Sequence, residues 1–261
     1  MTDKQCAARF QAEVLIEQSP ISKASVQEYA EDTDVDLDAV FQAIEIEQAY
    51  HASPVVRVHR GIIEPVLDDW TKAPALALCL IFDVLGAAGD PEGTRLFERV
   101  VEVALRNHLQ HAVYDNSAVS GRGLRARVRD FATLTSLMEG RSPDPDLKDD
   151  RVDLIAHTSF DDERSANLYV LMQCAAGKRW TNKKQIELDR WAQYLDWPRT
   201  NISRAISTVQ FLEPTGKWQT LSTDYGMLMD RVRIHRAYGE GEEALNGELE
   251  AWAKKRYREV E

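Results

Sequence analysis

The chain has 261 residues, of which 44% are hydrophobic and 29% are charged, and its formal net charge is −11. This balance is typical of a globular protein and excludes a disordered chain, and no apolar run approaches the roughly 20 residues that a membrane span needs. Three cysteines far apart in the sequence argue against a disulfide framework and a zinc site, and no secretion signal is visible, so we expect a cytoplasmic protein without membrane contacts.

Apolar residues three or four positions apart predict helices through most of the first half of the chain. The run that starts at Ala73 is apolar except for Asp83 and predicts a buried helix. Asp90 and Pro91 have the residue types of an N-cap and a first helical position, so a long amphipathic helix is expected to begin there. Further helices are expected at 6–18, 22–33, 36–51, 61–72 and 123–140.

The segment 140–153 is rich in Pro, Asp and Ser and predicts a linker between domains. After it, helices are expected at 161–177, 182–195, 199–210 and 225–237, with a last one near the C-terminus. A short β-hairpin around Gly216 is the main strand signal. The sequence therefore predicts an all-α protein with domains at 1–140 and 154–238 and a C-terminal helix at 239–261.

Charge differs between these parts of the chain. Residues 1–150 contain 15 Lys and Arg against 26 Asp and Glu, whereas residues 177–236 contain 11 against 6. The acidic first part suits protein partners. The basic region suits phosphate, because salt screens the charge of the rest of the chain beyond roughly 8 Å.

The stretch RWAQYLDWPRTNISRAI, residues 190–206, has the spacing of a helix-turn-helix. Ala192 is the small residue needed where two helices cross, and Ile202 and Ile206 would anchor the second helix. Asp196 stands where such turns commonly carry Gly, and a positive φ is expected there. The outward face of the second helix would carry side chains that suit phosphate and base-edge contacts, namely Arg199, Thr200, Asn201, Ser203 and Arg204. The stretch resembles helix-turn-helix and winged-helix DNA-binding domains.

Two clusters of cations add to this interpretation. Lys178, Arg179, Lys183 and Lys184 precede the first of the two helices and could contact phosphates, or could simply match the dipole of a helix end. On a helix, Arg122, Arg125 and Arg129 share one face, which could be a second phosphate patch or a solvated face that pairs with nearby acids.

The stretch from Ala30 could also fold as a helix-turn-helix. Its outward face would carry Asp34, Asp36 and Asp38, which repel phosphate, so there we expect a protein contact or an acidic turn that caps a helix.

Catalytic and metal-binding patterns are absent from the sequence. There is no HExxH, GxSxG, GxGxxG or phosphate-loop motif, and no cofactor or metal site is expected. The sequence thus predicts a non-enzymatic protein that binds nucleic acid, DNA rather than RNA, as a regulator or a subunit of a larger complex. Two alternatives stay open: an adaptor whose helix-turn-helix docks protein, and a nuclease whose acids assemble in three dimensions.

Overall fold

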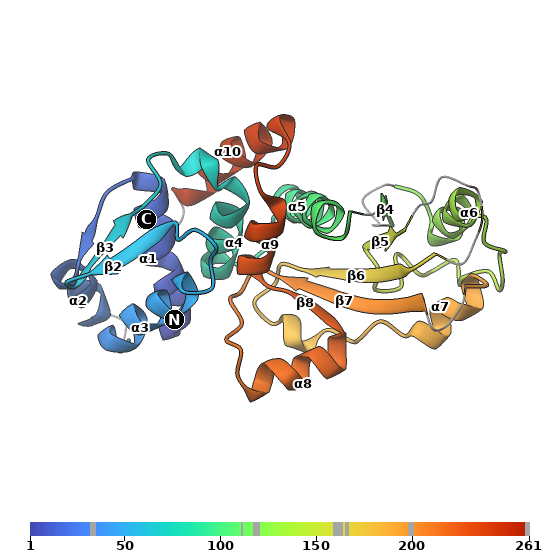
Figure 1. Cartoon of the computed structure of the whole chain (residues 1–261), viewed down its shortest axis with the longest axis horizontal. Helices are drawn as coiled ribbons and strands as arrows, with labels where there is room; N and C mark the ends of the chain where they lie inside the picture. Colours follow the sequence, from blue (N-terminus) through green and yellow to red (C-terminus); the bar gives the residue numbers. More distant parts are fainter. Residues whose placement is uncertain are drawn as a thin grey trace.

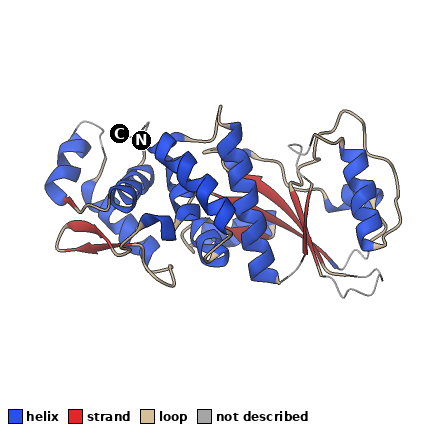
Figure 2. Ribbon diagram, turned by 90° about the horizontal axis from the view of Figure 1, so that it is seen from above, coloured by secondary structure: helices blue, strands red, loops and turns tan. Residues whose placement is uncertain are grey.

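The computed structural model describes residues 1–31, 35–110, 112–116, 121–158, 164, 167–197 and 201–258. Helices surround two β-sheets, one of three strands and one of five (Figures 1 and 2). The protein is therefore an α/β protein, and the predicted all-α class is wrong. No helix among the described residues is long and apolar enough to cross a membrane.

The N-terminal part of the chain, residues 1–65, contains the smaller sheet, and we call it the N-terminal unit. Its strands pair antiparallel in the order β1-β3-β2, and residues Arg60 and Gly61 form the β2–β3 turn with positive φ, as a tight hairpin requires. The elements are α1 (Asp3–Glu17), β1 (Ile21–Ser22), α2 (Lys23–Glu31), α3 (Leu37–Gln48), β2 (Val56–His59) and β3 (Ile62–Pro65). Helices α2 and α3, which we call the helix pair, flank the part of the chain after Ala30 where a second helix-turn-helix was expected, and residues 32–34 between them lie outside the described residues.

The second helix of this pair, α3, has an acidic start. Asp36 caps it by accepting hydrogen bonds from the backbone N–H groups of Asp38 and Ala39, which confirms the expected capping turn. Asp38 and Glu45 are exposed on α3, and Lys23 neutralises Asp38 at 2.8 Å. The predicted outward residue Asp34 lies outside the described residues.

The five-stranded sheet has the order β4-β5-β6-β7-β8. Its strands are β4 (Ala112–Asp115), β5 (Leu154–His157), β6 (Tyr169–Ala175), β7 (Ile202–Thr208) and β8 (Met227–Met229). The first three pair antiparallel, whereas β6, β7 and β8 run parallel. The carboxyl ends of the three parallel strands therefore lie at the same end of the sheet as the first residues of β5.

Helices cover both faces of this sheet. Alternate side chains decide the face: Met172 belongs to the same apolar core as helix α5, whereas its neighbour Leu171 packs with α6 and α7. The third core places Ile206 and Leu228 with α8. These helices and the remaining ones are α4 (Pro74–Leu85), α5 (Pro91–Leu109), α6 (Leu124–Thr135), α7 (Leu188–Tyr194), α8 (Gly216–Tyr225), α9 (Arg231–Tyr238) and α10 (Glu243–Tyr257), with 3₁₀ turns η1 (Trp70–Lys72) and η3 (Trp180–Asn182).

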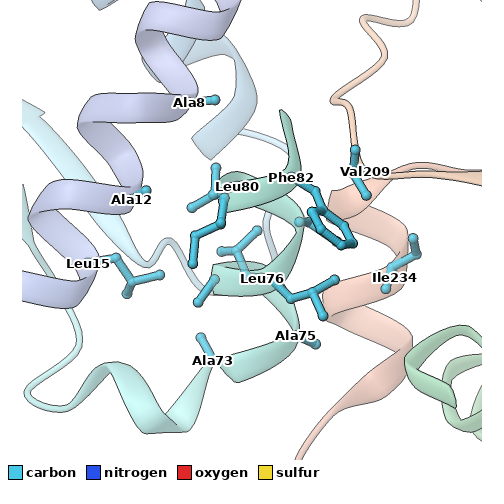
Figure 3. Close-up of a cluster of buried hydrophobic side chains, with 14 of the residues drawn as sticks. Ala8, Ala12, Leu15, Ala73, Ala75, Leu76, Leu80, Phe82, Val209 and Ile234 are labelled. Atoms are coloured by element: carbon cyan, nitrogen blue, oxygen red, sulfur yellow. The ribbon is translucent and has the colours of Figure 1, made fainter. Parts of the chain in front are cut away.

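Several predicted helices are confirmed. Helix α4 is buried along its length, and α5 begins at Pro91 with the Asp90 carboxylate accepting from the Gly93 N–H at 2.8 Å. The largest core joins α4 to α1 and to residues from the far half of the chain. Figure 3 shows Leu76 and Leu80 of α4 between Leu15 of α1 on one side and Val209 and Ile234 on the other, with Phe82 facing the second side. This core unites residues on both sides of segment 140–153, and the proposed domain boundaries at 140, 154 and 238 remain predictions.

The predicted helix-turn-helix at 190–206 is not formed. Its first helix exists as α7, but residues 202–208 are strand β7 in the middle of the sheet. Asp196 is not among the residues with positive φ, and its N–H donates to the carbonyl of Met138. The predicted helix at 161–177 is strand β6 in its last part, and helix α8 replaces the predicted hairpin around Gly216. The segments 61–72 and 199–210 were also expected to be helical and contain strands.

Candidate functional site

A carboxylate and an ammonium group meet at the carboxyl end of β6. Asp153 directly precedes β5, and its Oδ2 accepts a hydrogen bond from the N–H of Cys174 at 2.6 Å. Lys183 Nζ donates to the carbonyl oxygen of the same residue at 2.8 Å. Since β5 begins opposite Met172, these two side chains occupy the strand edge that β5 leaves unpaired. Open α/β sheets commonly bind ligands at this end of their parallel strands.

The surroundings of Asp153 favour its protonated form. Burial raises the pKa of Asp153 to about 6, the Cys174 N–H and Lys183 act in the opposite direction, and Asp149 and Asp115 add to the increase. Gln173, which precedes Cys174 in strand β6, is buried, and its Oε1 has no hydrogen-bond partner among the described residues. The site thus contains a carboxylate that titrates near neutral pH and a cation.

The predicted cations Lys178, Arg179, Lys183 and Lys184 lie on one exposed loop, residues 177–184, which we call the basic loop. The loop is anchored at its middle by Trp180, which is buried against Tyr225 and the end of the sheet. The Tyr225 hydroxyl lies 2.9 Å from the Lys183 carbonyl oxygen, and Lys178 Nζ donates to the carbonyl of Val84 at 2.5 Å. These contacts and that of Lys183 Nζ with Cys174 hold the loop in place, whereas Arg179 and Lys184 are exposed.

The remaining predicted residues of the 190–206 stretch do not form one face. Arg199 and Thr200 lie outside the described residues. Asn201 donates to the carbonyl of Asn167 at 3.4 Å, Ser203 is exposed, and Arg204 lies on the opposite face of β7 from Ser203 because strand residues alternate. Since Ile202–Thr208 is a strand, the expected common helical face of these side chains is wrong.

Arg204 lines a groove of about 870 Å³ beside α7. Its guanidinium donates to Gln185 Oε1 at 2.9 Å and to the carbonyl of Thr223. Together with Arg204, the other charged lining residues balance in sign, since Arg141 and Arg190 are positive and Asp144, Glu187 and Asp189 are negative. This groove therefore has no excess of positive charge.

The second predicted patch, at Arg122, Arg125 and Arg129, lies at and before helix α6. Arg122 forms an ion pair with Asp130, and Arg129 lies 3.5 Å from Glu139, whereas Arg125 is exposed. Nearby acids thus neutralise part of this patch, as the alternative interpretation expected.

A buried ion cluster was missed by the sequence reasoning. Arg231, at the start of α9, donates from Nε and Nη2 to the two carboxylate oxygens of Glu47 at 2.6 and 2.5 Å, and from Nη1 to Asp83 at 2.6 Å. All three residues are at most 4% exposed. A cavity of about 270 Å³ borders the cluster, with Gln210 and Lys178 also in its wall.

Signals for these residues exist in the sequence. Asp83 interrupts an otherwise apolar helix, and a carboxylate that must be buried needs a cation. Asp153 stands immediately before the apolar run Leu154–Ala156, and a polar residue at this position is typical of the start of a strand. Nothing in the sequence, however, indicates that Asp83 pairs with Arg231 or that Asp153 and Lys183 both bind the backbone of Cys174.

Metal ligation by side-chain clusters has little support in the described part of the chain. No group of three or more His, Cys, Asp or Glu side chains that could hold a metal ion occurs among those residues. The three cysteines are buried thiols, and burial raises the pKa of Cys6 to about 11 and also raises those of Cys79 and Cys174. They are therefore not reactive thiolates.

Comparison with known proteins identifies no family. No family model matches the chain, and no curated protein matches it. A solved structure described as the MspJI restriction endonuclease in complex with a 27-mer oligonucleotide is similar, with 14% identity and a TM-score of 0.33. The similarity covers 73% of this chain and 36% of that chain, so this chain spans little more than a third of the other. At this TM-score the similarity establishes neither fold nor function.

Proposed function

We propose that this protein binds nucleic acid through the basic loop at the carboxyl end of β6. The observation that carries the proposal is the loop itself, which is held by buried Trp180 and presents exposed Arg179 and Lys184, with the Lys183 ammonium bound beside them to Cys174. Cations of this kind supply the sequence-independent part of nucleic-acid affinity by displacing counterions from phosphates. The proposal concerns nucleic-acid binding in general and does not depend on a helix in the major groove.

Anchoring of the loop favours binding. A phosphate contact from a mobile segment costs the entropy of ordering that segment. Here the loop forms the 3₁₀ turn η3, and the N–H groups of Asn182 and Lys183 donate to carbonyls within it at 3.1 and 2.9 Å. Little order has to be gained on binding, so most of the electrostatic attraction is retained as affinity.

The net charge of −11 does not oppose this mode of binding. Salt screens charges beyond roughly 8 Å at physiological ionic strength, so the loop acts on phosphates as a local field. Binding is expected to weaken steeply as salt increases, by a slope of about 0.9 in log affinity against log salt for each duplex phosphate neutralised.

The test removes two charges from the loop and keeps its anchors. Arg179→Gln with Lys184→Gln should weaken binding to a short duplex and lower the salt slope by about 2, since each phosphate contact that is removed lowers it by roughly one. Lys254→Gln with Lys255→Gln is the matched control, because both lysines are exposed on the remote helix α10. Fluorescence anisotropy at several salt concentrations, with duplex DNA, single-stranded DNA and RNA, measures both quantities.

Two results would contradict the proposal. The first is a wild-type protein without salt-sensitive affinity for any of the three nucleic acids, which would favour the adaptor alternative. The second is an equal loss of affinity and slope in the loop variant and in the α10 control, which would show that the overall charge, and not the loop, determines binding.

Asp153 favours a second candidate function, hydrolysis of the bound phosphodiester. Mg²⁺ takes oxygen ligands and is often bound by one or two carboxylates together with substrate phosphates, and the Asp153 carboxylate would supply one such ligand. Lys183 is placed to stabilise the charge that develops on the phosphoryl group. Water would add to phosphorus as the P–O bond to the leaving oxygen breaks, with one water proton passing to that oxygen and the other to solvent.

A cleavage assay with Mg²⁺ or Mn²⁺ separates this candidate from binding alone. Cleavage by the wild-type protein that Asp153→Asn and a chelator both abolish would support hydrolysis. Salt-sensitive binding without cleavage would remove the second candidate and leave the first.

A further inference from the structure

The basic loop is connected to the buried ion cluster through one side chain, Gln210. This residue follows strand β7, and its Oε1 accepts a hydrogen bond from Trp180 Nε1 at 2.9 Å. Its Nε2 donates to Asp83 Oδ1 at 3.3 Å, and Asp83 in turn accepts from Arg231. Gln210 therefore lies between the anchor of the loop and helix α4.

Hydrogen-bond chemistry explains why this residue is a glutamine. The indole N–H of Trp180 can only donate, so it fixes the orientation of the amide and turns the NH₂ group toward Asp83. A carboxylate at position 210 could accept from Trp180 and would face Asp83 with like charge, whereas an aliphatic side chain would make neither bond. Among polar side chains of this length, an amide satisfies both partners.

The chain of bonds continues to the N-terminal unit. Arg231 joins Asp83 on α4 to Glu47 on α3, which is the second helix of the helix pair. Gln11 on α1 also donates to Glu47, at 3.0 Å. A continuous path of hydrogen bonds therefore runs from α1 and α3, through α4 and α9, to Trp180 in the basic loop.

We infer that Gln210 is a positioning residue for nucleic-acid binding, because it couples the order of the basic loop to the N-terminal unit. This inference rests on the proposed function for its effect on affinity, but the coupling itself concerns the loop alone. A displacement of α3 or α4 changes the position of Asp83 and hence the support of Trp180. Contacts made by the N-terminal helix pair can thus regulate the distant phosphate-binding loop.

The main experiment measures loop order directly. Gln210→Leu keeps the size of the side chain and removes both hydrogen bonds, and Trp180→Phe removes the same bond from the other end while retaining an aromatic ring. Hydrogen exchange of peptides that cover residues 177–184 should become faster in both variants. Gln42→Leu, on an exposed position of α3, is the control and should leave this exchange unchanged.

A double variant tests whether the two residues act through one bond. If they do, Gln210→Leu combined with Trp180→Phe should increase exchange little more than the stronger single variant, whereas independent effects would add. Affinity for the duplex should fall about fivefold in each single variant, because both variants lose the hydrogen bond to Trp180 that supports the loop. Thermal unfolding of each variant shows that the fold is retained.

The outcomes separate this inference from the proposed function. Unchanged exchange in residues 177–184 of Gln210→Leu and Trp180→Phe, or additive effects in the double variant, would overturn the coupling. Faster exchange with wild-type affinity for nucleic acid would overturn the positioning role. A wild-type protein that does not bind nucleic acid would overturn the proposed function, and with it the positioning role, while the exchange data would still decide the coupling.

Discussion

Replacing Arg231 with methionine tests the energetic importance of the buried ion cluster. The change keeps a long, unbranched side chain and removes the cation that both Glu47 and Asp83 need. The three side chains are almost inaccessible to solvent, and water in the adjoining cavity could replace hydrogen bonds of the guanidinium but not its charge. Two carboxylates would remain buried without a counter-ion.

The expected cost follows from the hydrogen bonds that the substitution removes. Arg231 makes three short hydrogen bonds to the two carboxylates, of 2.5–2.6 Å. Breaking a buried ion pair by removing one partner destabilises a protein by about 3–5 kcal/mol, and that range is expected at neutral pH. Arg236→Met, on an exposed position of the same helix, should change the free energy of unfolding by less than about 0.5 kcal/mol.

The pH dependence gives an independent check. Burial alone would raise the pKa of Glu47, but the bound guanidinium lowers it to about 2; for Asp83 burial dominates and its pKa is raised. In the wild type, the depressed pKa of Glu47 contributes stability above its unfolded value, which is lost as pH falls toward 2. In Arg231→Met both pKa values should lie above those of the unfolded chain, so protonation should restore stability as pH falls.

The measurement is urea unfolding, followed by circular dichroism, at pH 7, 5.5 and 4.5. The difference between wild type and Arg231→Met should shrink steadily over this series as the variant's carboxyls become neutral. A cost below about 1 kcal/mol at pH 7, far under the range for a broken buried pair, would refute the reasoning. A difference that is independent of pH would show that poorer packing, rather than charge, is the cause.

Two further predictions concern packing and titration. Gly93→Ala places a Cβ atom 2.5 Å from Phe82 Cζ and 2.7 Å from Trp252 Nε1, so it should lower the free energy of unfolding by about 1–3 kcal/mol. Gly247→Ala on α10 has open space around it and should raise the free energy of unfolding by about 0.5–1 kcal/mol. Thermal melts of the two variants compare these effects. Because the pKa of Asp153 is raised to about 6, its contribution to stability is present at low pH and is lost as pH rises from about 4 to about 6. Asp153→Asn should therefore flatten the dependence of stability on pH in this range. An unchanged pH dependence would show that another group titrates there.

The sequence by itself determined the helices whose signals are local. Helix α5 repeats apolar residues on one face and begins with Asp90 and Pro91, and both signals lie within the helix or directly before it. The apolar run of α4 and the final helix α10 were likewise predicted. Such elements satisfy their backbone hydrogen bonds internally, so a short window of sequence contains most of the information that specifies them.

Tertiary structure decided the five-stranded sheet and the candidate site. Strand β6 is buried on both faces, so its sequence YVLMQCA has no polar alternation and is as compatible with a buried helix as with a strand. Pairing with β7 some thirty residues later makes it a strand. The same holds for the side chains that act together: Asp153 and Lys183 both bind the backbone of Cys174, and Arg231 reaches Glu47 across 184 positions. Strand pairing and burial of charge depend on partners distant in sequence, so the physical cause of these contacts lies outside any local window.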